Sequence, residues 1–106
     1  MGKYLIQASY TAEGAKGLLK EGGTKRRATI EATARAVGGR LEAFYFAFGE
    51  TDAFVVIDGV DAASAAAVAL TVAASGAVRS QTTVLLTPED VDEACRKSVS
   101  YRAPGS

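Results

Sequence analysis

The chain has 106 residues, with twelve basic and twelve acidic side chains and no histidine. This length suits one domain built around one core. The balanced charge argues against nucleic-acid binding, because the only basic cluster is the short run Lys25-Arg26-Arg27. Without histidine, Ser-His-Asp and Cys-His catalysis and most zinc or non-haem iron sites are excluded. We therefore expect no metal, no cofactor and no recognisable catalytic residue.

Two further features of the sequence concern its cellular environment. The single cysteine, Cys95, cannot form an internal disulfide, which is compatible with a reducing compartment. No apolar run approaches the roughly 20 residues of a membrane-spanning helix, and no basic leader precedes an apolar segment. These observations predict a cytoplasmic protein without a membrane partner.

The first third of the chain predicts a strand followed by an interrupted helix. Residues 3–10 are rich in side chains that suit a strand. Thr11 can cap a helix over residues 12–21, which Gly22-Gly23 then interrupts, since each glycine costs a helix roughly 1 kcal/mol relative to alanine. Thr24 can restart the helix. Its apolar stripe follows helical spacing at Ile30, Thr33, Ala34 and Val37.

The middle of the chain predicts a hairpin. Gly38-Gly39 is a typical helix end. Arg40 to Phe48 and Asp52 to Asp58 are both rich in strand-forming residues, and the segment between them is short enough to make them neighbours.

The remaining elements are a helix, a strand and a terminal helix. Asp61 can cap a helix over residues 62–75, and residues 78–86 form the fourth predicted strand. Thr87-Pro88-Glu89-Asp90 combines a cap, a proline in the first turn and acidic residues, so it predicts a helix that runs to about residue 98. We expect residues 101–106 to be a flexible tail.

This order of elements is the split βαβ pattern of the ferredoxin-like fold. It predicts an α+β domain over residues 1–100, a βαββαβ sandwich whose four-stranded antiparallel sheet has the order 4-1-3-2. The two main helices would cover one face of the sheet, because short connections and right-handed crossovers leave few other arrangements. A C-terminal helix would follow the fourth strand.

The bare face of this sheet is predicted to carry too many apolar side chains for a monomer. Strict alternation places Phe44, Phe46 and Phe48 on one side of the second strand, and we expect them to join Phe54 and Val56 there. Such a patch would exceed the few hundred Å² that monomers usually expose. The sequence therefore predicts a homodimer, or a higher homo-oligomer, formed through this open face. The alternative is that the terminal helix covers the face with its narrow stripe at Val91, Ala94 and Cys95.

Several motifs resemble those of the GYD domain family. They are the opening K-Y-L-I-Q-A-S-Y-T, the K-R-R of the first helix, the G-G before the second strand, F-G-E-T-D-A-F-V-V-I, and T-T-V-L-L-T-P-E-D. The resemblance covers roughly Lys3 to Asp92. The family commonly has G-x-Y-D at this hairpin; Gly49 and Asp52 match it, and Thr51 stands in the place of the tyrosine. The resemblance implies a chain related to the dimeric α+β barrel proteins and brings no established activity.

Five residues are candidates for ligand binding: Gln7, Tyr10, Arg27, Tyr45 and Asp52. Gln7 is a polar residue in a predicted central strand and needs a partner, and both tyrosines offer a ring and a hydroxyl. Arg27 is the member of its basic cluster that we expect to turn inward, since it offers a bidentate fork. Glu50 and Asp52 are interpreted as turn residues rather than a catalytic pair, with Asp52 able to anchor the next strand.

Three functions remain open from the sequence. The first is a homo-oligomer that binds a small apolar or aromatic molecule, or another protein, without catalysis. The second is a cofactor-independent monooxygenase or isomerase of the dimeric α+β barrel type, in which Tyr45, Gln7 or Asp52 would steer protons on an aromatic or lactone substrate. The third is a purely structural assembly subunit. Because one fold hosts many functions, fold kinship alone does not choose among them.

Overall fold

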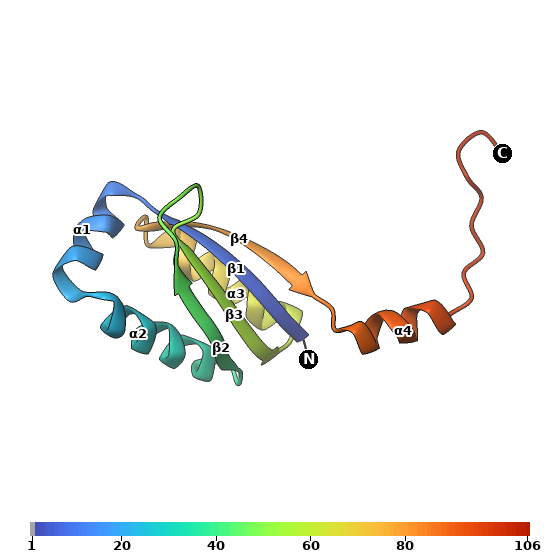
Figure 1. The fold of residues 1–106 in the computed structure, drawn as a ribbon, viewed down its shortest axis with the longest axis horizontal. Coiled ribbons are helices and arrows are strands. Elements are labelled where there is room, and N and C mark those ends of the chain that lie inside the picture. The colour runs from blue at the N-terminus through green and yellow to red at the C-terminus, as the bar shows by residue number, and fades with distance from the viewer. Residues whose placement is uncertain (1) are drawn as a thin grey trace.

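The computed structural model describes residues 2–106, and they form one antiparallel sheet with helices. The elements in chain order are β1 (Gly2–Tyr10), α1 (Ala12–Glu21), α2 (Gly23–Ala36), β2 (Arg40–Phe46), β3 (Ala53–Val60), α3 (Ala62–Ala74), β4 (Val78–Leu85) and α4 (Pro88–Arg96). The sheet order is β2-β3-β1-β4. This is the predicted 4-1-3-2 order counted from the other edge, so the ferredoxin-like α+β fold is confirmed (Figure 1).

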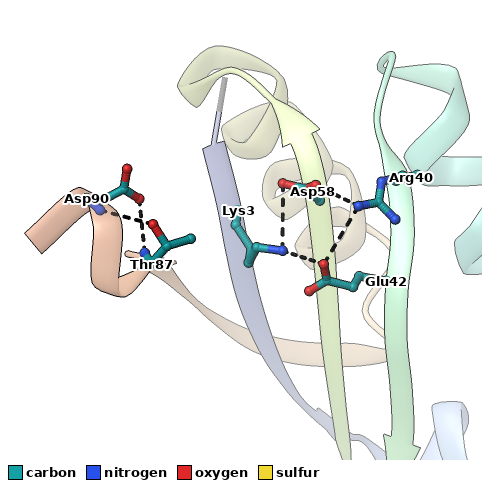
Figure 2. Close-up of polar contacts among 6 residues, drawn as sticks. All are labelled: Lys3, Arg40, Glu42, Asp58, Thr87 and Asp90. Carbon is teal, nitrogen blue, oxygen red and sulfur yellow. Dashed lines mark hydrogen bonds and ion pairs between the residues drawn. The ribbon is translucent and has the colours of Figure 1, made fainter.

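The helix starts follow the caps that the sequence contains. The Gly14 N–H donates to Thr11 Oγ1 at 3.3 Å, and the Ser64 N–H donates to the Asp61 carboxylate at 2.7 Å. This hydrogen bond from the Ser64 backbone, and a further one from the Ser64 side chain, lower the pKa of Asp61. At the start of α4, the Thr87 N–H donates to the Asp90 carboxylate and the Asp90 N–H donates to Thr87 Oγ1. These two hydrogen bonds form a complete capping box (Figure 2).

Two element boundaries differ from the prediction because of backbone conformation. The second helix begins at Gly23, with Gly22 rather than Thr24 as its cap, because Gly22 has φ +85° and turns the chain between α1 and α2. Strand β2 ends at Phe46 rather than Phe48. Phe48 has φ +56°, which is incompatible with a strand.

The predicted distribution of phenylalanines on the sheet is wrong. Phe44 pairs with Val55 and Tyr45 pairs with Phe54, and residues that pair across strands point to the same face. The register also shifts between Leu41 and Ala43, a bulge that breaks strict alternation in β2. Phe44 and Phe46 consequently pack against the core beneath the helices, whereas Phe54 lies on the open face.

The core between the helices and the sheet is small. The buried hydrophobic residues are Ala8, Ala34, Ala53, Val55, Ile57, Val60, Val68 and Val78. Seven of these eight residues, all except Val68, form two clusters, and Phe44 packs against both. Alanine supplies three of these eight positions, and no large side chain is fully buried within residues 2–106. Much of the covered face is therefore lined by half-buried side chains.

Helix α4 does not cover the open face of the sheet, contrary to the alternative considered above. Every residue from 88 to 106 is exposed, and α4 lies beyond the end of β4, away from the sheet (Figure 1). The radius of gyration is 16.8 Å, whereas a compact chain of this length would have about 13 Å. Within residues 2–106, the apolar stripe of α4 and the open face of the sheet are therefore both left without a partner.

Candidate functional site

A groove separates α1 and α2 from α3. It has a volume of about 350 Å³ and runs from Tyr10 and Gly14 along α1 to Ile30 and Val72 on the facing helices. A deeper pocket of about 40 Å³ continues from it to the covered face of the sheet, where Phe44 is part of the lining. We call these two connected spaces the helix groove. Its volume lies within the range of small-molecule sites.

One end of the helix groove is closed by contacts between α1 and the turn before β4. The Thr11 N–H donates to the Ala77 carbonyl at 3.0 Å, and the Thr11 hydroxyl reaches the Gly76 and Ala77 carbonyls at 3.0 and 3.1 Å. Gly14 permits this approach, since a Cβ at that position would overlap the Ala77 carbonyl oxygen. The close packing fixes the position of Tyr10, which begins the groove.

Most hydroxyl groups on the groove wall already donate to backbone carbonyls. Thr29 donates to the Lys25 carbonyl and Thr33 to the Thr29 carbonyl. Thr71 and Ser75 on α3 likewise donate within their own helix. Within residues 2–106, the polar side chains of the groove wall that remain free to donate are Arg26 and the hydroxyl of Tyr10. The deeper pocket adds Ser80 and Thr82 on β4.

Arg26 is the basic residue that turns toward the helix groove. It lines both the groove and its deeper pocket and is half-buried, whereas Lys25 and Arg27 are exposed. The sequence prediction chose Arg27 instead. Arg26 precedes Ile30 by four residues and Thr33 by seven, so it lies on the apolar stripe of α2. That spacing is the signal in the sequence that distinguishes Arg26 from Arg27.

A second, more open cleft lies beside α1 at the β2–β3 hairpin. It has a volume of about 550 Å³, and Phe46 and Phe48 line it together with Tyr10 and Asp52. The two phenylalanine rings stack with their centroids 5.6 Å apart. Because Phe48 is largely exposed and has a positive φ, the hairpin holds it in an unfavourable conformation.

Asp52 anchors the hairpin to the end of β1. Its carboxylate accepts the Tyr10 N–H at 2.8 Å, and its own N–H donates to the Ala8 carbonyl at 2.8 Å. Ser9 adds a hydrogen bond to the Glu50 carbonyl at 3.2 Å. The carboxylate of Glu50 is absent from the hydrogen bonds and ion pairs of residues 2–106, and its residue is exposed. This geometry agrees with the interpretation of Asp52 as a strand anchor.

The structure divides the five predicted ligand-binding residues among four places. Tyr10 and Asp52 meet at the hairpin cleft, and Tyr10 also belongs to the helix groove. Arg27 lines a separate shallow surface with Phe44 and Phe46. Gln7 and Tyr45 both pair with Phe54 and therefore lie on the opposite, open face of the sheet. The five residues do not form one site.

The open face carries its side chains in rows across the strands. One row runs Tyr45, Phe54, Gln7 and Gln81, and the next runs Ala43, Val56, Leu5 and Thr83. Tyr45 is 71% exposed and Phe54 37% exposed. Apolar side chains thus fill the part of the open face formed by β2 and β3 and reach β1 at Leu5, whereas the β4 side is polar.

A network of four charged side chains lies at one end of the open face. Arg40 contacts Asp58 at 3.0 Å and Glu42 at 3.8 Å, and Lys3 contacts Glu42 and Asp58 (Figure 2). Glu42 lies at the bulge in β2 and contacts Arg40 on its own strand and Lys3 on β1. Two positive and two negative groups balance one another, so the network is polar without a net charge.

Comparison with known proteins supplies the family. A model of the GYD domain matches residues 4–95. The chain belongs to the GYD domain family. Comparison with curated proteins and with solved structures finds no match. In this GYD domain, Gly49 and Asp52 lie in the hairpin beside the second cleft, and Thr51 between them is half-buried.

The part of the chain that the structure describes was expected to hold neither a metal site nor a membrane-spanning helix. Residues 2–106 contain no group of three or more metal-ligating His, Cys, Asp or Glu side chains. Among the helices of that same stretch, none has both the length and the apolar character needed to cross a bilayer.

Proposed function

We propose that this GYD domain is a homo-oligomeric protein that binds a small apolar or aromatic molecule. The observation that carries the proposal is the combination of a groove of about 350 Å³ beneath the helices with an uncovered apolar region on the other face of the sheet. The first supplies space for a ligand, and the second supplies a surface for a second copy of the chain.

The open face has the properties of a self-complementary surface. Phe54, Val56 and Leu5 provide apolar area, and burying one such side chain contributes about 1.5–3 kcal/mol. In a two-fold contact the same patch meets itself. The network of Lys3, Arg40, Glu42 and Asp58 carries both signs of charge, so two copies of it can face each other in a complementary arrangement.

Gln7 adds a polar argument for the same contact. It lies between Phe54 and Gln81 on the open face, and its side-chain amide makes no hydrogen bond within residues 2–106. Amide groups that become buried need partners. A second copy would bring Gln81 and Gln7 of one sheet against polar groups of the other, so Gln7 would act in assembly instead of in the ligand binding predicted from the sequence.

The helix groove supports ligand binding more strongly than catalysis. Ile30, Val68 and Val72 make its walls apolar, and few polar side chains converge on it. The residues suggested for proton transfer are separated, because Tyr45 and Gln7 lie on the open face and Asp52 lies at the hairpin cleft. A monooxygenase or isomerase that uses these three residues together is not supported by this geometry.

Thermal-shift measurements against a metabolite library, combined with native mass spectrometry, test the proposed ligand binding. We expect small apolar or aromatic compounds to raise the melting temperature, because a ligand that binds only the folded state stabilises it by mass action. Val72 lines the groove. The variant Val72→Asp would place a charge on the groove wall and should abolish that shift. Absence of a shift with every compound, together with no retained ligand in any preparation, would contradict the proposal.

A further inference from the structure

The helix groove contains a positive charge without an anionic partner. Arg26 lies among apolar groove residues such as Ile30 and Val68, and it is half-buried. It takes part in none of the ion pairs or side-chain hydrogen bonds within residues 2–106. Removing a charge even partly from water is unfavourable unless an opposite charge or hydrogen-bond acceptors compensate. The surroundings of Arg26 therefore favour an anion.

The acidic residues of the groove do not supply that anion. Glu13 and Glu21 line its α1 side, but both are exposed and lie at its rim. Glu13 contacts Lys16 at 3.6 Å on the same helix, and Glu21 is within ion-pair distance of no basic group in residues 2–106. These carboxylates would repel an anionic group at the α1 rim and leave Arg26 on α2 as its favoured position.

The hydrogen-bond donors of the groove point to the same ligand chemistry. The hydroxyls of Thr29, Thr33 and Thr71 already donate to helix carbonyls at 3.1, 2.9 and 2.8 Å. A ligand between the helices therefore meets Arg26 and the Tyr10 hydroxyl as free donors, and the deeper pocket adds the neutral hydroxyls of Ser80 and Thr82. Arg26 is the one charged donor among them. The planar fork of a guanidinium matches the two oxygens of a carboxylate, and such charge-assisted pairs are stronger than neutral hydrogen bonds.

We propose that the helix groove binds a small amphipathic carboxylate, with the carboxylate on Arg26 and the apolar body along Ile30, Val68 and Val72. This inference rests on the ligand binding proposed above and names the chemical class of the ligand. Tyr10, at the closed end of the groove, is a second donor to a ligand oxygen. The site belongs to one chain and does not require the open face of the sheet.

Isothermal titration with three eight-carbon probes that differ only in the head group tests the proposal. The probes are octanoate, 1-octanol and octylammonium. We expect octanoate to bind the wild-type chain at least about tenfold more tightly than 1-octanol, the ratio that one charge-assisted hydrogen bond supplies. Octylammonium should bind more weakly still, and added salt should weaken octanoate binding alone.

The neighbouring arginines provide a matched pair of variants. Arg26→Gln should reduce octanoate affinity about tenfold, to the level of 1-octanol, while Arg27→Gln, an exposed position on the same turn, should leave it unchanged. Neither variant should lower the melting temperature, since neither arginine takes part in an ion pair within residues 2–106. Arg26→Lys should recover part of the preference for octanoate.

The outcomes separate this inference from the ligand binding on which it rests. Equal binding of octanoate and 1-octanol, or equal losses in Arg26→Gln and Arg27→Gln, would overturn the role of Arg26 and leave an apolar groove. Octylammonium as the tightest probe would show that Glu13 and Glu21, rather than Arg26, select the ligand. If none of the three probes binds at millimolar concentration and the metabolite library also gives no shift, the proposed ligand binding fails as well.

Discussion

The two faces of the sheet are built from alternate residues of the same strands, yet only one is covered by its own chain. On β3, Ala53, Val55 and Ile57 are buried beneath the helices, whereas Phe54 between them is exposed. The covered face holds the small buried side chains of the core together with Phe44 and Phe46, and it borders a groove. The open face holds Tyr45 and Phe54, and within residues 2–106 no helix lies over it. The comparison teaches that the size of a side chain does not decide its burial in this protein. The side of the strand on which it lies does.

The sharpest way to test this difference is to truncate neighbouring residues on opposite faces. Ile57→Ala should lower the free energy of unfolding by about 2–5 kcal/mol at every protein concentration, because it removes buried contacts within one chain. Phe54→Ala should instead show a loss that increases with protein concentration, because its contacts lie between copies. Chemical denaturation at several concentrations measures both. A concentration-independent loss for Phe54→Ala would mean that the open face is not an interface.

A smaller effect is expected at the close contact that holds α1 over the covered face. Gly14→Ala should destabilise the fold by about 1–3 kcal/mol, since the new methyl group overlaps the Ala77 carbonyl. Gly17 lies one turn later and nothing lies within 4 Å of a Cβ there. Gly17→Ala should therefore stabilise the chain by about 0.5–1 kcal/mol. Thermal unfolding of the two variants measures both changes in stability. A Gly14→Ala variant more stable than the wild type would contradict the close packing.

The sequence contained enough local information to predict the fold. The caps Thr11, Asp61 and Thr87 each start a helix where expected. The order of elements then left one topology, which the sheet confirms. These features are local or follow from connection rules, so they require no knowledge of distant contacts.

The distribution of side chains around the sheet was less predictable. The bulge between Leu41 and Ala43 moved Phe44 to the covered face, and strict alternation gave no sign of it. Asp52 anchors the strand as the sequence suggested. The prediction of Arg27 rested on guanidinium chemistry, which all arginines share, whereas the spacing on the α2 stripe places Arg26 inward. A site assembled from α1, α2, α3 and the sheet depends on contacts between distant segments, which residue patterns alone do not specify.

Light scattering on the purified chain at micromolar concentration tests most directly whether the open face is an interface. The wild-type chain should have at least twice the mass of one 10.9 kDa chain. The variant Phe54→Asp should remain folded, because its side chain is exposed within one chain, and should scatter as a single chain. A folded wild-type particle of 10.9 kDa that does not associate as concentration rises would contradict self-association through the open face.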